Sequence, residues 1–141
     1  MKIVYLLIAI PIVFASEQSV RVVGKLTCHG HPAQYAELQL VSKFSIGGEA
    51  FARNIFTDPA GNFNIAGYID PSSWSKIDAR LYVWHKCYEK PYEHSDPCSN
   101  WFEIKIPGIY VNDGPFAKKK WDLGEVKLEK PRSGQQLDSC D

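Results

Sequence analysis

The sequence has no excess of charge of either sign, since 16 Lys and Arg residues balance 16 Asp and Glu residues. Because phosphate neutralisation by a basic surface dominates most nucleic-acid affinities, this balance gives no indication of a DNA or RNA partner. The chain also lacks a Gly-x-Ser-x-Gly elbow and a glycine-rich phosphate loop. We therefore predict a protein that is not an enzyme and that uses no cofactor, no metal and no nucleic acid.

The material for a folded core is present. Hydrophobic residues make up 45% of the 141 residues and aromatic residues 13%, whereas disordered chains have few aromatics and a high net charge. This size and composition are typical of one globular domain.

Long apolar runs are absent except at the start of the chain. Lys2 is followed by 13 residues without charge, and Ser16 and Glu17 end the run. A membrane-spanning helix needs roughly 20 apolar residues, so the run predicts a signal peptide over residues 1–15 and no transmembrane segment. We expect a secreted, extracellular protein with one domain at residues 16–130 and a C-terminal tail at residues 131–141.

Alternation of apolar and polar residues is the main pattern in the rest of the chain, and it is typical of strands with one buried face. The segments that show strand character are residues 20–28, 36–40, 49–57, 62–66, 80–83, 102–106 and 121–128. Between two of them, Asp58 is able to accept a backbone hydrogen bond two residues on, and Gly61 tolerates a positive φ, which predicts a tight turn. Seven short strands in this length favour a β-sandwich.

The four cysteines, Cys28, Cys87, Cys98 and Cys140, should pair if the protein is exported, and three connectivities are open to them. Cys87 with Cys98 is the favoured local pair, because they lie 11 positions apart at the ends of two predicted strands. Cys28 with Cys140 then follows by elimination.

A zinc site is the alternative use of the same cysteines. Cys28 and His31 are close in sequence, as are His85 and Cys87, and zinc takes four nitrogen or sulfur ligands from such short spacings. Oxidising conditions compete for the thiols, so disulfides are the preferred interpretation.

Three consecutive lysines, Lys118, Lys119 and Lys120, form the one concentrated positive feature, between Phe116 and Trp121. They are either a solubilising surface segment or a contact for an anionic surface such as lipid headgroups or an acidic receptor patch.

Several motifs occur in order along residues 20–129. They include Val23-Gly24-Lys25-Leu26-Thr27-Cys28, Thr57-Asp58 with Gly61-Asn62-Phe63, His85 with Cys87, and Trp121-Asp122-Leu123-Gly124. As an ordered set they resemble the nematode transthyretin-like family. The resemblance implies an all-β, transthyretin-like (immunoglobulin-like) β-sandwich of about seven to eight strands, secretion, and disulfide-bonded cysteines at Cys87 and Cys98.

The resemblance also bears on function. It implies an extracellular binding or signalling protein whose partner is a cell surface, lipid or receptor, and it leaves the oligomeric state open. A carrier of a small apolar ligand is the alternative. An enzyme of the hydroxyisourate hydrolase type is disfavoured, because such relatives end in Tyr-Arg-Gly-Ser and the present chain ends in Gln135-Gln136-Leu137-Asp138-Ser139-Cys140-Asp141.

Overall fold

The structure is a computed structural model, and it describes residues 3–5, 17–71, 75–87, 99–130 and 136–137. Apart from residues 3–5, the expected signal peptide lies outside the described residues, as do Cys98 and Cys140. No helical segment within the described ranges has the length and apolar character needed to cross a bilayer.

The described chain is all-β, with seven strands of six or more residues, three two-residue strands and one short 3-10 turn. The strands are β1 (Gln18–Cys28), β2 (His31–Pro32), β3 (Glu37–Phe44), β4 (Gly47–Phe56), β5 (Asn62–Ile69), β6 (Asp78–His85), β7 (Asn100–Lys105), β8 (Asn112–Asp113), β9 (Trp121–Lys127) and β10 (Gln136–Leu137), with the turn η1 at Gly108–Tyr110. The seven strand segments expected from sequence are confirmed.

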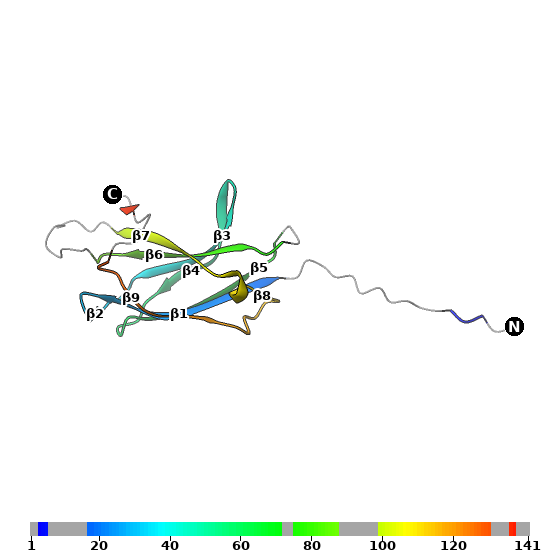
Figure 1. Ribbon diagram of the computed structural model, residues 1–141, viewed down its shortest axis with the longest axis horizontal. Coiled ribbons are helices and arrows are strands. Elements are labelled where there is room, and N and C mark those ends of the chain that lie inside the picture. Colours follow the sequence, from blue (N-terminus) through cyan, green and yellow to red (C-terminus); the bar gives the residue numbers. More distant parts are fainter. Residues whose placement is uncertain (1–2, 6–16, 72–74, 88–98, 131–135, 138–141) are drawn as a thin grey trace.

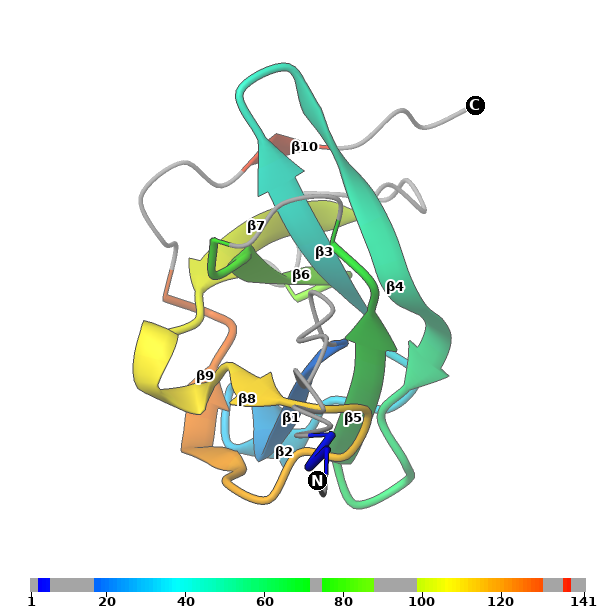
Figure 2. The ribbon, with the colours of Figure 1, turned by 90° about the vertical axis from the view of Figure 1, so that its right-hand side faces the viewer.

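Two sheets stack face to face (Figures 1 and 2). In the first sheet β1 is central, with β5 and β2 paired antiparallel to it, β9 paired parallel to it, and β8 paired to its first residues. The second sheet is antiparallel in the order β10-β7-β6-β3-β4. Two residues of the expected C-terminal tail thus pair with β7 as β10.

Every second residue along the strands lies between the two sheets, and these side chains fill the space there. Val20, Val22 and Leu26 of β1 are at most 1% exposed, and they belong to one core cluster with buried residues of the facing sheet. The facing residues are Leu38, Leu40, Leu81, Val83 and Phe102. Full burial of each such side chain contributes about 1.5 to 3 kcal/mol, so the period-two pattern of the sequence is the main source of fold stability.

The disulfide joins Cys28 to Cys87, with an S–S distance of 2.06 Å and Cα atoms 5.7 Å apart. The expected pairs of Cys87 with Cys98 and of Cys28 with Cys140 are therefore wrong. Cys28 ends β1 and Cys87 follows β6, so the bond connects the two sheets at one end of the sandwich. The expectation that cysteines close in sequence pair with each other did not find this disulfide, because Cys28 and Cys87 are 59 residues apart.

Peptide mapping of the unreduced protein tests the disulfide pattern. We expect a Cys28–Cys87 linked peptide, and the only connectivity that contains this bond also joins Cys98 to Cys140. Strand pairing of Leu137 with Asn100 leaves those two cysteines within three residues of paired positions, so chain length permits them to meet. Recovery of a Cys87–Cys98 peptide would contradict this pattern.

The turn before β5 docks against β1. Asp58 Oδ1 accepts a hydrogen bond from the backbone N–H of Ala60 at 2.9 Å, as the sequence predicted, and a second from the Asn62 N–H at 2.9 Å. The Gly61 carbonyl accepts one from the Leu26 N–H at 2.8 Å. Gly61 has a φ of +81°, and a Cβ placed on it would lie 2.5 Å from the Leu26 carbonyl oxygen.

Gly30 offers a matched control for this position, since its φ is +80° and a Cβ there would meet nothing within 4 Å. We expect Gly30→Ala to lower the free energy of unfolding by about 1 kcal/mol through backbone strain alone. Gly61→Ala should cost about 2 kcal/mol more, because the methyl group forces the turn away from β1. Urea denaturation of the two variants measures the difference, and equal losses would contradict the close approach.

Candidate functional site

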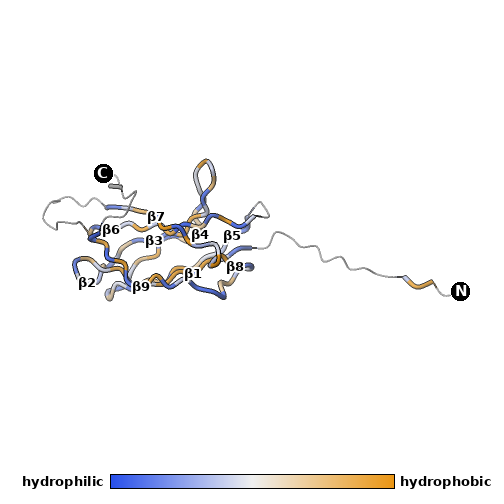
Figure 3. Tube along the Cα trace, viewed as in Figure 1, coloured by the Kyte–Doolittle hydropathy of each residue, from blue (hydrophilic) through white to orange (hydrophobic). Residues whose placement is uncertain are grey.

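The three lysines lie in the connection between β8 and β9, which we call the lysine loop (residues 114–120). Lys118, Lys119 and Lys120 are all exposed. Figure 3 shows this connection as a largely hydrophilic stretch at the surface. The structure therefore places the predicted residues where a large partner surface can reach them.

Asn112 fixes the backbone of the lysine loop. The two N–H groups of its side-chain Nδ2 are shared among three carbonyl oxygens, those of Tyr110 and Lys119 at 3.0 Å each and that of Ser19 at 3.3 Å. Its Oδ1 accepts a hydrogen bond from the Lys119 N–H at 2.9 Å. One side chain thus connects both ends of the loop to β1. The sequence does not single out Asn112, because an Asn outside any motif gives no sign of its distant partners.

Aromatic residues pack beside the same loop. The rings of Tyr110 and Trp121 stack with centroids 5.8 Å apart, and the Lys119 Nζ lies 5.2 Å from the Tyr110 ring centroid. This cation–π contact, worth about 0.5 to 1 kcal/mol at an exposed site, holds the middle lysine over the stack. Lys118 and Lys120 flank it on the surface.

Phe116 stands beside the lysines with 80% of its surface exposed. Together with Pro115 and Ala117 it lines one side of a shallow surface cavity of about 510 Å³, and Arg21 and Asn64 line the strand side. Aromatic residues are enriched at protein interfaces relative to the rest of the surface. The charge is moderate, because Asp113 and Asp122 flank the three lysines.

The zinc interpretation does not fit the cysteines as they are found. The candidate ligand atoms of Cys28, His29 and Cys87 lie within 4.8 Å of one another, so the residues do come together. However, the two sulfur atoms are bonded to each other, and zinc needs thiolates. His85 Nδ1 accepts a hydrogen bond from the Cys87 N–H at 3.0 Å, which also gives that nitrogen a structural role.

The outer face of the second sheet carries a charged network. Arg80 donates from Nε and Nη2 to the two carboxylate oxygens of Asp78 at 2.9 and 3.0 Å, and Lys43 Nζ lies 3.0 Å from a Glu103 carboxylate oxygen. Hydrogen bonds from Arg80 hold the pKa of Asp78 below its ordinary value, against the opposing effect of burial. Burial acts to raise the pKa of Glu103, but hydrogen bonds from Lys43 and Tyr82 outweigh it and the pKa is lowered.

Comparison with known proteins identifies the family. A model described as the transthyretin-like family matches residues 23–107, which run from β1 to just beyond β7. The chain belongs to this family. Transthyretin-like protein 5 of Caenorhabditis elegans is 30% identical over 142 residues and covers 98% of both chains.

Two further transthyretin-like relatives from Caenorhabditis elegans support the assignment. Transthyretin-like protein 2 is 29% identical over 117 residues, covering 79% of this chain and 75% of its own. Transthyretin-like protein 1 is 28% identical over 130 residues, covering 87% and 80%. Among solved structures, a 9R-lipoxygenase from Cyanothece PCC8801 aligns with a TM-score of 0.43 and 16% identity over 79% of this chain and 16% of that one, too distant to inform function.

Acid titration tests the charged network. A carboxyl group with a lowered pKa in the folded state contributes stability above its unfolded pKa of about 3.9, and the contribution is lost as the pH falls through the folded value. Because Asp78 is 40% exposed, Arg80→Gln should cost about 1 kcal/mol or less at neutral pH, a fall of up to about 4 °C in Tm. The Tm difference from the parent protein should shrink between about pH 5 and about pH 2. A pH-independent difference would mean that Arg80 acts through packing alone.

Proposed function

We propose that this transthyretin-like protein is a secreted, non-catalytic binding or signalling protein that contacts an anionic extracellular surface through its lysine loop. Lipid headgroups and an acidic receptor patch are the two surfaces of this kind. The observation that carries the proposal is the presentation of three exposed lysines and Phe116 on one loop whose backbone Asn112 fixes.

The chemistry of the loop suits a negatively charged partner. Each Lys near an anionic membrane contributes about 1 kcal/mol, and a partly inserted phenyl ring adds apolar burial. Since the loop backbone is already held to β1, little conformational entropy is lost when a partner binds.

An extracellular location rests on the signal-peptide pattern of residues 1–15. The Cys28–Cys87 disulfide is in keeping with it, because structural disulfides persist in oxidising compartments.

A carrier of a small apolar ligand is the second candidate function. Core side chains fill the space between the sheets in the described part of the chain, so a carrier would have to use a surface site. The observation that favours such a role is a cavity of about 390 Å³ beside the disulfide.

Vesicle co-sedimentation tests the lysine loop. The mature protein should bind vesicles that contain phosphatidylserine or phosphatidylglycerol and should lose affinity as salt rises. The triple variant Lys118→Glu, Lys119→Glu, Lys120→Glu should bind about 100-fold more weakly, from loss of about 1 kcal/mol per lysine.

Lys25, Lys127 and Lys130 provide the matched control, because they are also exposed and lie toward the other end of β1. Their conversion to Glu changes the net charge by the same amount and should have a much smaller effect. Equal losses in the two triple variants would show that overall charge governs binding. Unchanged binding in the Lys118–Lys120 variant would exclude the loop as the contact.

A further inference from the structure

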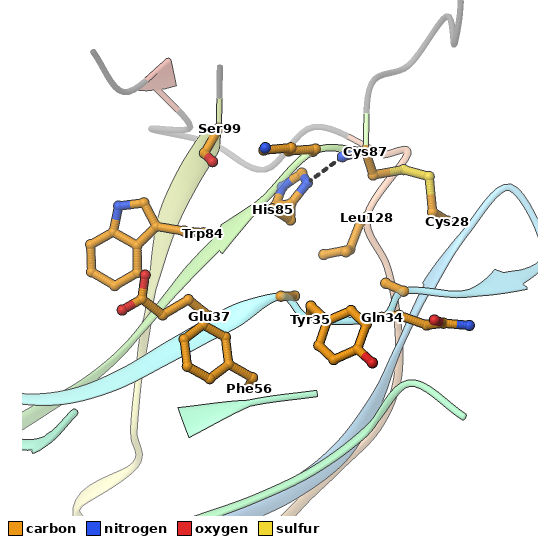
Figure 4. Close-up of a pocket in the computed structure, with 13 residues that line it drawn as sticks. Cys28, Gln34, Tyr35, Glu37, Phe56, Trp84, His85, Cys87, Ser99 and Leu128 are labelled. Atoms are coloured by element: carbon orange, nitrogen blue, oxygen red, sulfur yellow. Dashed lines mark hydrogen bonds between the residues drawn. A yellow bond between two sulfur atoms is a disulfide. The ribbon is translucent and has the colours of Figure 1, made fainter. Parts of the chain in front are cut away.

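A cavity separate from the lysine loop lies at the disulfide end of the sandwich (Figure 4). Its volume of about 390 Å³ falls within the range of small-molecule sites, roughly 300 to 1,000 Å³. Aromatic and charged side chains line it, among them Tyr35, Glu37, Phe56, Trp84 and Lys86.

Strand pairing places one carboxylate between two aromatic rings. Glu37 on β3 is the cross-strand partner of Phe56 on β4 and of Trp84 on β6, so the three side chains share one face of the sheet. Directly opposed residues have Cβ atoms roughly 4.5 to 5.5 Å apart. Figure 4 shows the Glu37 carboxylate extending alongside the Trp84 indole, with the Phe56 ring on its other side.

Thr57 fixes a third ring at the same cavity. Its hydroxyl donates to the Ala33 carbonyl at 2.6 Å and accepts from the Ala36 N–H at 2.9 Å, while its carbonyl accepts from the Tyr35 N–H at 3.2 Å. These bonds hold Tyr35 at a φ of +58°, a conformation that is unfavourable for a side chain of this size, and leave 71% of the residue exposed. The ring is thereby presented at the cavity rather than packed into the core.

The electrostatics at Glu37 favour a cation. Within the described part of the chain, no hydrogen bond or ion pair to the Glu37 carboxylate is found, including any from Lys86. The faces of aromatic rings carry negative potential, so Trp84 and Phe56 add to the negative field of the carboxylate. A primary ammonium would need several hydrogen-bond acceptors to replace its water, whereas a methylated ammonium presents an apolar, charged surface that suits rings and one counter-ion.

We propose that this cavity binds a small quaternary ammonium ion of the choline type, with Glu37 as its counter-ion and the Trp84 and Phe56 rings as its contact faces. An anionic group on the same ligand would meet Lys86, which lines the cavity as well. The site is independent of the lysine loop and of the proposal made for it.

Titration with choline chloride, followed by tryptophan fluorescence and calorimetry, tests the site. Choline should bind saturably, and its neutral isostere 3,3-dimethyl-1-butanol should bind at least about tenfold more weakly, because it has the same shape without the charge. Equal binding of the two compounds, or no saturable binding of choline, would overturn the proposal.

Two variants test which residues of the cavity bind choline. Glu37→Gln keeps the size of the side chain and should weaken choline binding at least about tenfold, and Phe56→Ala, at a half-exposed position, should also weaken it. Glu49→Gln, at an exposed carboxylate elsewhere on β4, is the matched control and should bind as the parent does. Thermal melts verify that each variant is folded, and unchanged affinity in folded Glu37→Gln would refute the counter-ion role.

Phosphatidylcholine vesicles distinguish the two sources of such a cation. Vesicle binding that depends on Glu37 and survives the Lys118–Lys120 substitutions identifies a lipid headgroup as the ligand. Choline binding without vesicle binding supports the site and identifies a free small molecule. Because phosphatidylcholine carries no net charge, these results are separable from failure of the lysine loop to bind anionic vesicles.

Discussion

Pairing of β1 along both of its edges is the constraint on which the rest of the structure depends. β5 and β2 cover one edge, β9 and β8 cover the other, and the inward side chains of β1 pack against the second sheet. Residues at both ends of β1 also hold the candidate sites in place. Ser19 near its start accepts a hydrogen bond from the residue that fixes the lysine loop, and Cys28 at its end forms the bond to Cys87 beside the cavity. The two candidate sites are therefore held at a set distance by one central strand.

The zero net charge of the chain gives no information about the local charge at these two sites. The lysine loop presents cations beside an exposed phenyl ring, and the cavity presents a carboxylate beside aromatic rings. The exposed cations of the loop and the carboxylate of the cavity would attract different partners, and neither attraction is evident from the sum over the sequence. Composition excluded a strongly basic binder, but only the fold shows where the balanced charges lie.

Local periodicity explains what the sequence could predict. Alternation such as that of Leu81 and Val83 against Arg80 and Tyr82 reports which side of a strand is buried, and the strands came out as expected. Family motifs then supplied the sandwich. The predicted disulfide pairing was wrong, because Cys28 and Cys87 belong to different sheets and their proximity follows from how the sheets stack. The alternative of a zinc site also brought Cys28 and Cys87 together, but only because each has a histidine nearby in sequence.

The parts of the sites that sequence could not reveal share a physical origin, which is long-range hydrogen bonding by single polar side chains. Asn112 reaches Ser19 across 93 positions, and the buried hydroxyl of Thr57 reaches the turn that carries Tyr35. Asn112 belongs to no motif named above, and the motif that contains Thr57 gives no sign of the partners of its hydroxyl. Each replaces water as the partner of backbone groups that a loop would otherwise expose, so the loop keeps one conformation. Loops fixed in this way can present large apolar groups to solvent without collapsing onto the core, and that explains how Phe116 and Tyr35 remain exposed on a small sandwich.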